Sequence, residues 1–339
     1  MILRTLLMAV TCCLLTTTLN AQNKKDTLPD GWTLGAGFGF DFAQLLQINP
    51  KQGAGQNQIG FGIATSGFAK YRKKRLAWDH AFLWQFGIQR LGSGIIAQGT
   101  SQRIPFQKSI DEFQYNVKFG YRTTKESKWF YAANTNLVTP LLPTYMGSED
   151  FPGNFLKDVA GMGQLRSRFF SPATLNISVG IDFKPDETFS AYYSPLGAKF
   201  IFVPDDEIAS LGVHGNPVEG EPDPESGRYT EFDNTFEAMG QTLRLGVSTK
   251  FMEDKGAFNS TLLLFSNYLV NPENIDVNWG TDLSVALVKN LQVSVNVNVF
   301  YDDDVRVQIT DFSKPNGVDG LGKRVSLTQQ LLIKYNFTI

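Results

Sequence analysis

The chain contains only two histidines, His80 and His214, so histidine-based catalysis has few possible centres. A Ser–His or Asp–His site needs an imidazole within reach of a nucleophile or a carboxylate. His80 shares an alternating face with Trp78 and Phe82, which indicates an aromatic belt rather than a catalytic position. His214 stands among glycine and proline residues, which indicate a loop. Neither histidine has a serine or carboxylate at motif spacing, so we predict that the protein is not an enzyme.

Both cysteines, Cys12 and Cys13, lie in an N-terminal apolar segment. Met1–Ala21 has an early arginine, an apolar run over Leu6–Leu15 and a small residue at its end, as a secretory signal peptide does. The apolar run is too short to span a bilayer. A lipid-anchored Cys12 is the alternative, although the residues before it fit a lipobox poorly. Cleavage after Ala21 leaves no cysteine, which excludes disulfides, cysteine-ligated metals and thiol catalysis.

Three consecutive carboxylates, Asp302, Asp303 and Asp304, form the one candidate metal site that the sequence suggests, for Ca²⁺. The EF-hand spacing is missing, and a solvated acidic rim is the favoured interpretation. A second acidic stretch, Asp205–Glu225, is rich in proline and predicts an exposed, mobile loop. Recognition of a basic ligand is the alternative for this loop. We expect no cofactor.

The elements that position these residues are visible as long stretches of alternating apolar and polar residues. From Trp32 to Phe42 every second residue is apolar, which predicts a β-strand long enough to cross a bilayer at a tilt. One later segment is bent near Pro195, and another, Phe258–Tyr268, is apolar on both faces. About twelve such segments can be followed along the chain. They are Trp32–Phe42, Ile59–Ile63, Trp78–Ile88, Phe113–Tyr121, Trp129–Leu137, Leu175–Phe183, Phe189–Val203, Leu243–Phe251, Phe258–Tyr268, Val277–Leu287, Leu291–Val299 and Val325–Phe337.

The composition fits strands better than membrane helices. Mean hydropathy is −0.16, and after the N-terminal segment no apolar run approaches the length of a transmembrane helix. The 27 phenylalanines, 11 tyrosines and 31 glycines suit strands, aromatic girdles and tight turns. A formal net charge of −2 gives no reason to expect nucleic-acid binding.

Connections between the segments alternate between short and long, as the periplasmic turns and outer loops of a membrane barrel do. The segments are mostly about ten residues or longer, whereas strands of a soluble sandwich or β-solenoid, the alternative, average about five to six. We therefore predict an all-β fold, a transmembrane antiparallel β-barrel of about twelve strands in the outer membrane of a Gram-negative cell. The barrel is expected over residues 32–339, after a short periplasmic segment at 22–31, and both termini are expected in the periplasm.

Charged residues recur on the polar face of the predicted strands and are therefore expected to point into the lumen. Such charges need partners or water. They fit a wetted pore for small polar solutes or a closed lumen in which charges pair, and their mixed signs argue against strong ion selectivity. The candidates are Asp41, Glu112, Lys118, Asp182, Arg244, Lys250, Asp276, Asp282 and Lys334.

An ordered set of short motifs runs from Gly31 to Phe337. It comprises Gly31-Trp32, Lys108-Ser109-Ile110-Asp111, Ser171-Pro172, Gly180-Ile181-Asp182-Phe183-Lys184-Pro185, Ser194-Pro195-Leu196-Gly197-Ala198-Lys199, Leu264-Phe265-Ser266-Asn267-Tyr268 and Tyr301-Asp302-Asp303-Asp304. With this set the chain resembles the domain-of-unknown-function 3078 family of Bacteroidetes. One departure is the absence of a tryptophan between Ile48 and Ile59, where the family often has an Asn-Trp step. The resemblance implies an outer-membrane barrel and no established activity.

These observations predict a monomeric, non-enzymatic outer-membrane barrel that acts as a channel or transporter for small solutes. The alternative is a binding or structural barrel of the cell envelope, whose long outer loops meet partners and whose lumen conducts nothing. The expected partners are outer-membrane lipid, the barrel-insertion machinery during biogenesis, and a small polar solute.

Overall fold

The computed structural model describes residues 30–48, 58–91, 106–147, 153–159, 161, 163–288, 291–302, 307–311 and 318–338. The predicted signal peptide, residues 1–21, lies outside this part of the chain, as does nearly all of the predicted segment 22–31. Among the described residues, no helix has the length and apolar character needed to cross a membrane.

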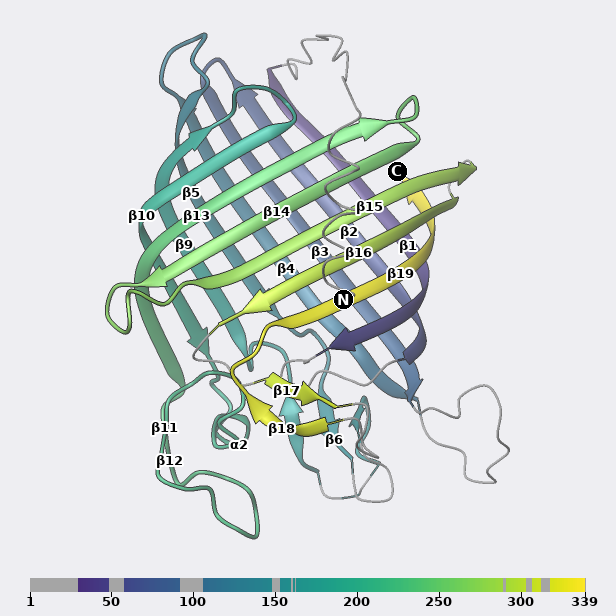
Figure 1. Cartoon of the computed structure of the whole chain (residues 1–339), viewed down its shortest axis with the longest axis vertical. Helices are drawn as coiled ribbons and strands as arrows, with labels where there is room; N and C mark the ends of the chain where they lie inside the picture. Colours follow the sequence, from purple (N-terminus) through teal and green to yellow (C-terminus); the bar gives the residue numbers. More distant parts are fainter. Residues whose placement is uncertain are drawn as a thin grey trace.

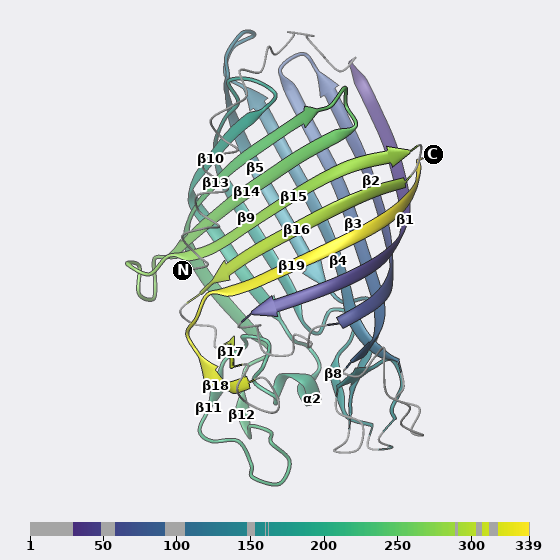
Figure 2. The same ribbon diagram turned by 45° about the vertical axis from the view of Figure 1, so that its right-hand side comes forward.

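Twelve long antiparallel strands form a closed barrel, in which β1 pairs with both β2 and β19 (Figures 1 and 2). They range from 11 to 18 residues. Each of the other strands pairs with the strand before it and the strand after it, when these twelve strands are taken in chain order. The strands are β1 (Gly31–Ile48), β2 (Gln58–Lys73), β3 (Leu76–Leu91), β4 (Gln107–Arg122), β5 (Trp129–Thr139), β9 (Ala173–Phe183), β10 (Phe189–Phe202), β13 (Thr235–Phe251), β14 (Gly256–Asn267), β15 (Asp276–Val288), β16 (Leu291–Tyr301) and β19 (Ser326–Thr338). The all-β antiparallel class predicted from the sequence is confirmed.

The outward face of these strands is apolar. Large side chains remain exposed at alternate positions, such as Leu34 at 71% and Phe61 at 62%. Near the short turns the exposed side chains are aromatic: Trp32 lies 5.2 Å from Tyr71 and 5.9 Å from Trp78 between ring centroids. An apolar outer band that ends in an aromatic girdle is the surface that lipid covers in transmembrane barrels.

Several strands extend beyond the sequence-predicted segments because their backbones pair further. Strand β1 continues to Ile48, opposite Leu327 of β19, whereas the predicted segment ends at Phe42. The polar residues at this end of β1 break the apolar alternation without breaking the hydrogen-bond ladder. Sequence alternation therefore marks the bilayer-crossing part of a strand better than its end.

The bend expected near Pro195 is a bulge in β10, where the register shifts between Ser194 and Gly197. Proline has no N–H for the ladder. The gap is closed by Ser194, whose hydroxyl donates to the Val179 carbonyl at 2.9 Å. At Gly180 a Cβ atom would lie 2.0 Å from the Tyr193 carbonyl oxygen, so only glycine allows this close approach. The wall is thus tightly packed at the bulge.

Long connections gather at the opposite end of the barrel from the short turns (Figures 1 and 2). They carry their own small elements. These are β6 (Thr144–Met146), β7 (Asn154–Phe155), β8 (Leu165–Ser167), α2 (Asp206–Ala209), β11 (Val218–Glu219), β12 (Glu231–Phe232), β17 (Val307–Thr310) and β18 (Val318–Gly322). We call the described residues of the connections 140–172 and 203–234 the loop cap.

The prediction of a mobile acidic loop at Asp205–Glu225 is wrong for its first part. Asp205 is buried, accepts hydrogen bonds from the backbone N–H groups of Glu207 and Ile208, and pairs with Arg168 at 2.7 Å. Ile208 is fully buried in a cluster with Val203. Asp205, which caps the N-terminus of helix α2, and this small apolar core hold the start of the acidic stretch in place. Both depend on contacts between two loops that are far apart in the sequence.

Candidate functional site

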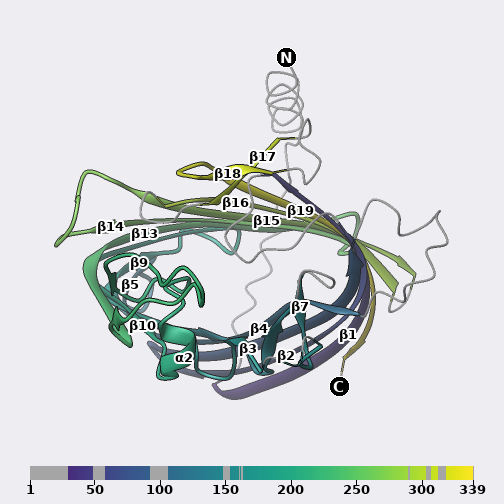
Figure 3. The same ribbon diagram turned by 90° about the horizontal axis from the view of Figure 1, so that it is seen from below.

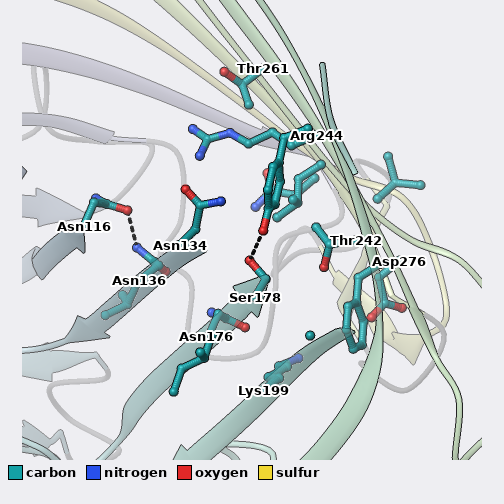
Figure 4. Close-up of a pocket in the computed structure, with 18 of the residues that line it drawn as sticks. Asn116, Asn134, Asn136, Asn176, Ser178, Lys199, Thr242, Arg244, Thr261 and Asp276 are labelled. Atoms are coloured by element: carbon teal, nitrogen blue, oxygen red, sulfur yellow. Dashed lines mark hydrogen bonds between the residues drawn. The ribbon is translucent and has the colours of Figure 1, made fainter. Parts of the chain in front are cut away.

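A cavity of about 470 Å³ lies in the lumen of the barrel. Figure 4 shows its polar wall, where side chains from β4, β5 and β9 lie on neighbouring strands. Asn136 donates to Asn116 at 2.8 Å, and the hydroxyl of Tyr192 donates to Ser178 at 3.0 Å. The amide- and hydroxyl-bearing residues of this wall are Gln114, Asn116, Asn134, Asn136, Asn176, Ser178 and Tyr192.

The other side of the cavity is partly apolar. Leu263 and Phe265 of β14 and Phe300 of β16 line it, between polar residues such as Asn278. This explains why β14 is apolar on both faces in the sequence: one face meets the outside and the other lines the lumen. A solute in this cavity meets hydrogen-bonding groups on one side and a hydrophobic surface on the other.

An ion cluster formed by β4, β9 and the residue that follows β9 lies beside the cavity, toward the short turns. Asp182 is almost fully buried and accepts from Lys118 at 2.6 Å and from Lys184 at 3.3 Å. The ammonium of Lys118 also lies 5.6 Å from the ring centre of Tyr192. Two cations on one carboxylate leave this cluster with a net positive charge.

A second cavity of about 1080 Å³ occupies the short-turn end of the barrel, and Lys118, Asp182 and Lys184 line it. Thr261 lines both cavities. Tyr192 and Arg244 line the first cavity, whereas their ionic neighbours Lys118 and Asp182 line the second. The ion cluster with Tyr192 and Arg244 therefore stands where the two cavities meet.

Arg244 lies on β13 and points into the first cavity (Figure 4). Its side chain is exposed although it lies inside the barrel. Within the described part of the chain it has no hydrogen-bond or ion-pair partner, and Asp182 attracts it only at longer range. A guanidinium that has no partner among the described residues depends on water for its stability, so the exposed side chain of Arg244 favours a hydrated lumen at this position.

The structure brings four of the predicted lumen residues to the cavities, namely Lys118, Asp182, Arg244 and Asp276. The other described candidates are elsewhere on the strands. Glu112 accepts from Gln114 at 2.5 Å, Asp282 accepts from Asn296 at 3.0 Å, and Lys250 is exposed beyond the cavities. Asp41 and Lys334 are register partners on β1 and β19. A functional role for any of these residues stays a prediction.

The candidate calcium residues are only partly described. Asp302 is 5% exposed and lines the first cavity, so it does not lie on a solvated rim. Asp303 and Asp304 lie outside the described residues. No cluster of three or more potential metal ligands is found within the described ranges, and the calcium hypothesis stays a prediction.

Sequence reasoning missed a buried ion pair at the loop end of β4. Lys108 and Asp111 lie 2.6 Å apart with side chains 6% and 1% exposed. Asp111 accepts from the Trp84 indole at 3.0 Å and from the Leu142 N–H at 2.7 Å, while Lys108 donates to the Leu142 carbonyl and to Thr144, both at 2.8 Å. We call this network the loop clamp, because it joins the loop cap to the barrel wall. Its signal was the Lys108-Ser109-Ile110-Asp111 motif.

The two histidines have structural partners. The imidazole of His80 hydrogen-bonds the Tyr115 hydroxyl at 2.8 Å and lies 4.7 Å from the Trp78 ring, within the aromatic girdle. In the loop cap, Nε2 of His214 donates to the carbonyl of Arg166 at 2.7 Å. Burial lowers the pKa of His214, and the nearby Arg166 charge adds to the effect, although the hydrogen bond opposes it.

We expect the loop cap to loosen as the pH falls below about 6.5, the pKa that His214 takes when unfolded. Below this pH the imidazole of His214 binds a proton in the unfolded loop more readily than in the folded loop. The stability that the folded loop has at neutral pH is therefore lost on acidification. Cleavage of the cap by a protease active from about pH 5 to 8, compared at each pH between wild type and His214→Gln, measures this loss. If the ratio of the cleavage rates of wild type and His214→Gln does not change with pH, this expectation is wrong.

Solved structures that resemble the chain are outer-membrane proteins of more than one kind. An outer membrane channel from Pseudomonas putida F1 is 12% identical with a TM-score of 0.36, covering 93% of this chain and 99% of that chain. The NanC porin is 7% identical with a TM-score of 0.37, covering 87% and 98%. Outer membrane phospholipase A from Escherichia coli, an enzyme, is 8% identical with a TM-score of 0.36, covering 93% and 94%.

No curated protein matches the chain. The family model described as "Protein of unknown function (DUF3078)" matches residues 46–145, a segment that contains the loop clamp residues Lys108 and Asp111. The resemblance inferred from the motifs is thereby confirmed for this segment, which carries the signature of the DUF3078 family.

Proposed function

We propose that the protein is a monomeric outer-membrane channel that lets small polar solutes cross through its lumen. The observation that carries this proposal is the exposed guanidinium of Arg244 inside the barrel, which has no hydrogen-bond or ion-pair partner among the described residues. A closed lumen would bury this charge without a partner, at a cost of several kcal/mol. A water-filled path removes that cost.

The arrangement of the cavities supports the same conclusion. The two cavities together follow the barrel from the loop end to the short-turn end and share Thr261. Seen from the loop end, the loop-cap elements α2 and β7 lie on different sides of the barrel mouth, at the left and at the right of the view (Figure 3). The ion cluster at Lys118 and Asp182 is the natural selectivity point, because a solute must pass its charges.

Single-channel recording tests the proposal. We expect the purified, refolded mature chain to give discrete and reproducible conductance steps in a planar bilayer. Heat-modifiable migration on electrophoresis serves as the check that the barrel is folded. A folded barrel that stays silent over many insertions would contradict the channel.

A binding or structural barrel is the second candidate, and the ordered loop cap favours it. The loop clamp and the Asp205–Arg168 ion pair fix long connections that a simple pore does not need. A chain in which residues 220–227, the exposed tip between β11 and β12, are replaced by a glycine–serine linker separates the two functions. Conductance should survive this change in a channel, whereas binding of a surface partner should be lost in the alternative.

A further inference from the structure

We propose that the lumen cavity binds a small hydroxylated solute that carries one anionic group, and that Arg244 binds this group. The proposal names a solute class for the channel proposed above and rests on it for its biological meaning. Its test by direct binding does not require conduction.

Arg244 is the group in the cavity best prepared to bind an anion. Its planar guanidinium presents five N–H donors, which suit the oxygens of a carboxylate or phosphate. Across the described ranges none of these donors has a partner. Asp182, the acid that attracts Arg244 electrostatically, already pairs with Lys118 at 2.6 Å and with Lys184 at 3.3 Å. The positive charge of Arg244 is therefore available to a solute.

The other charges of the cavity are compatible with this assignment. Lys199, also without a partner in the described part of the chain, lines the cavity closer to the loop end, where β10 pairs with Ala238. The acids Asp276 and Asp302 line it too, but both interact with other groups of the protein. The charges that remain free to meet a solute are thus positive.

The polar wall determines the rest of the solute. Side-chain amides both donate and accept hydrogen bonds, as hydroxyl groups do. Asn134 and Asn176 line the cavity with no side-chain hydrogen bond among the described residues. Leu263, Phe265 and Phe300 offer an apolar surface for the C–H groups of the same molecule. A cavity of about 470 Å³ suits a molecule of one or two sugar residues in size.

Calorimetric titration of the folded, detergent-solubilised protein with gluconate tests the proposal. We expect gluconate to bind, and sorbitol, the polyol of equal chain length without the carboxylate, to bind at least about tenfold more weakly. Arg244→Gln should weaken gluconate binding about tenfold or more and leave sorbitol unaffected. Lys250→Gln is the matched control, because Lys250 is an exposed cation on the same strand but outside both cavities.

Three results would overturn the assignment: no gluconate binding to the wild type up to about 50 mM, equal affinity in Arg244→Gln, or an equal loss in Lys250→Gln. Conductance is recorded separately on the same samples. A barrel that conducts but does not bind gluconate supports the proposed channel and contradicts the proposed solute class. A folded barrel that does not conduct but binds gluconate through Arg244 supports the binding site and contradicts the proposed channel.

Discussion

Replacing Asp111 by asparagine is expected to lower the free energy of unfolding by about 3–5 kcal/mol, the usual cost of breaking a buried ion pair on one side. Lys108 would keep its charge while its side chain is only 6% exposed. The variant should also release the loop cap, because Asp111 accepts from the backbone N–H of Leu141 and Leu142. Unfolding in urea, followed by heat-modifiable migration, measures the first effect, and protease cleavage within 140–172 measures the second.

Asp79→Asn is the matched control for the loop clamp. Asp79 pairs with Arg72 near the short turns, where both side chains are more than a quarter exposed, and such a pair contributes about 0–1 kcal/mol. The double variant Lys108→Met/Asp111→Asn should recover part of the loss, since it removes the orphaned charge. If Asp111→Asn and Asp79→Asn lower the free energy of unfolding by the same amount, the loop clamp stabilises the protein no more than an exposed ion pair does.

The loop clamp also shows where sequence reasoning reaches its limit in this fold. Period-two alternation locates strands because it reports the two environments that a barrel wall separates. By that alternation Asp111 falls on the outward, apolar face of β4 with Phe113. A register shift between β3 and β4 and the overlying residue Leu142 turn this position into a buried polar site. Neither the bulge nor a contact between residues 31 apart follows from alternation alone.

The charged residues of the lumen show a second limit of the alternation pattern. Alternation predicts an inward position for Lys118 and Asp182, and both line the second cavity. It does not predict which charges pair, because pairing depends on the stagger between β4 and β9 across β5. It also cannot predict that Arg244 has no ion-pair partner within the described part of the chain, where Asp182 attracts it only at longer range. The loop cap lay furthest from prediction, since its core joins Val203 and Ile208 with Leu165 of another connection. Only a folded barrel end brings these residues together.

The second large effect is expected from Asp182→Asn, which should shift the permeability of the channel toward anions. The substitution leaves Lys118, Lys184 and Arg244 without the one carboxylate that they share. Uncompensated positive charge where the two cavities meet attracts anions and repels cations. With a KCl gradient across a planar bilayer, the chloride-to-potassium permeability ratio should rise roughly threefold or more at about 0.1 M salt, and less at about 1 M, where screening is stronger.

Two further variants decide whether the shift arises at this cluster. Asp254→Asn makes the same chemical change on an exposed turn between β13 and β14 and should leave the reversal potential unchanged. Lys118→Gln/Asp182→Asn removes one charge of each sign and should return the reversal potential toward the wild-type value. Lys118→Gln alone should move it in the opposite direction, which keeps the test open if Asp182→Asn does not fold. Equal reversal potentials in all folded variants at low salt would mean that ions do not pass this cluster, and the path through the lumen would have to be sought elsewhere.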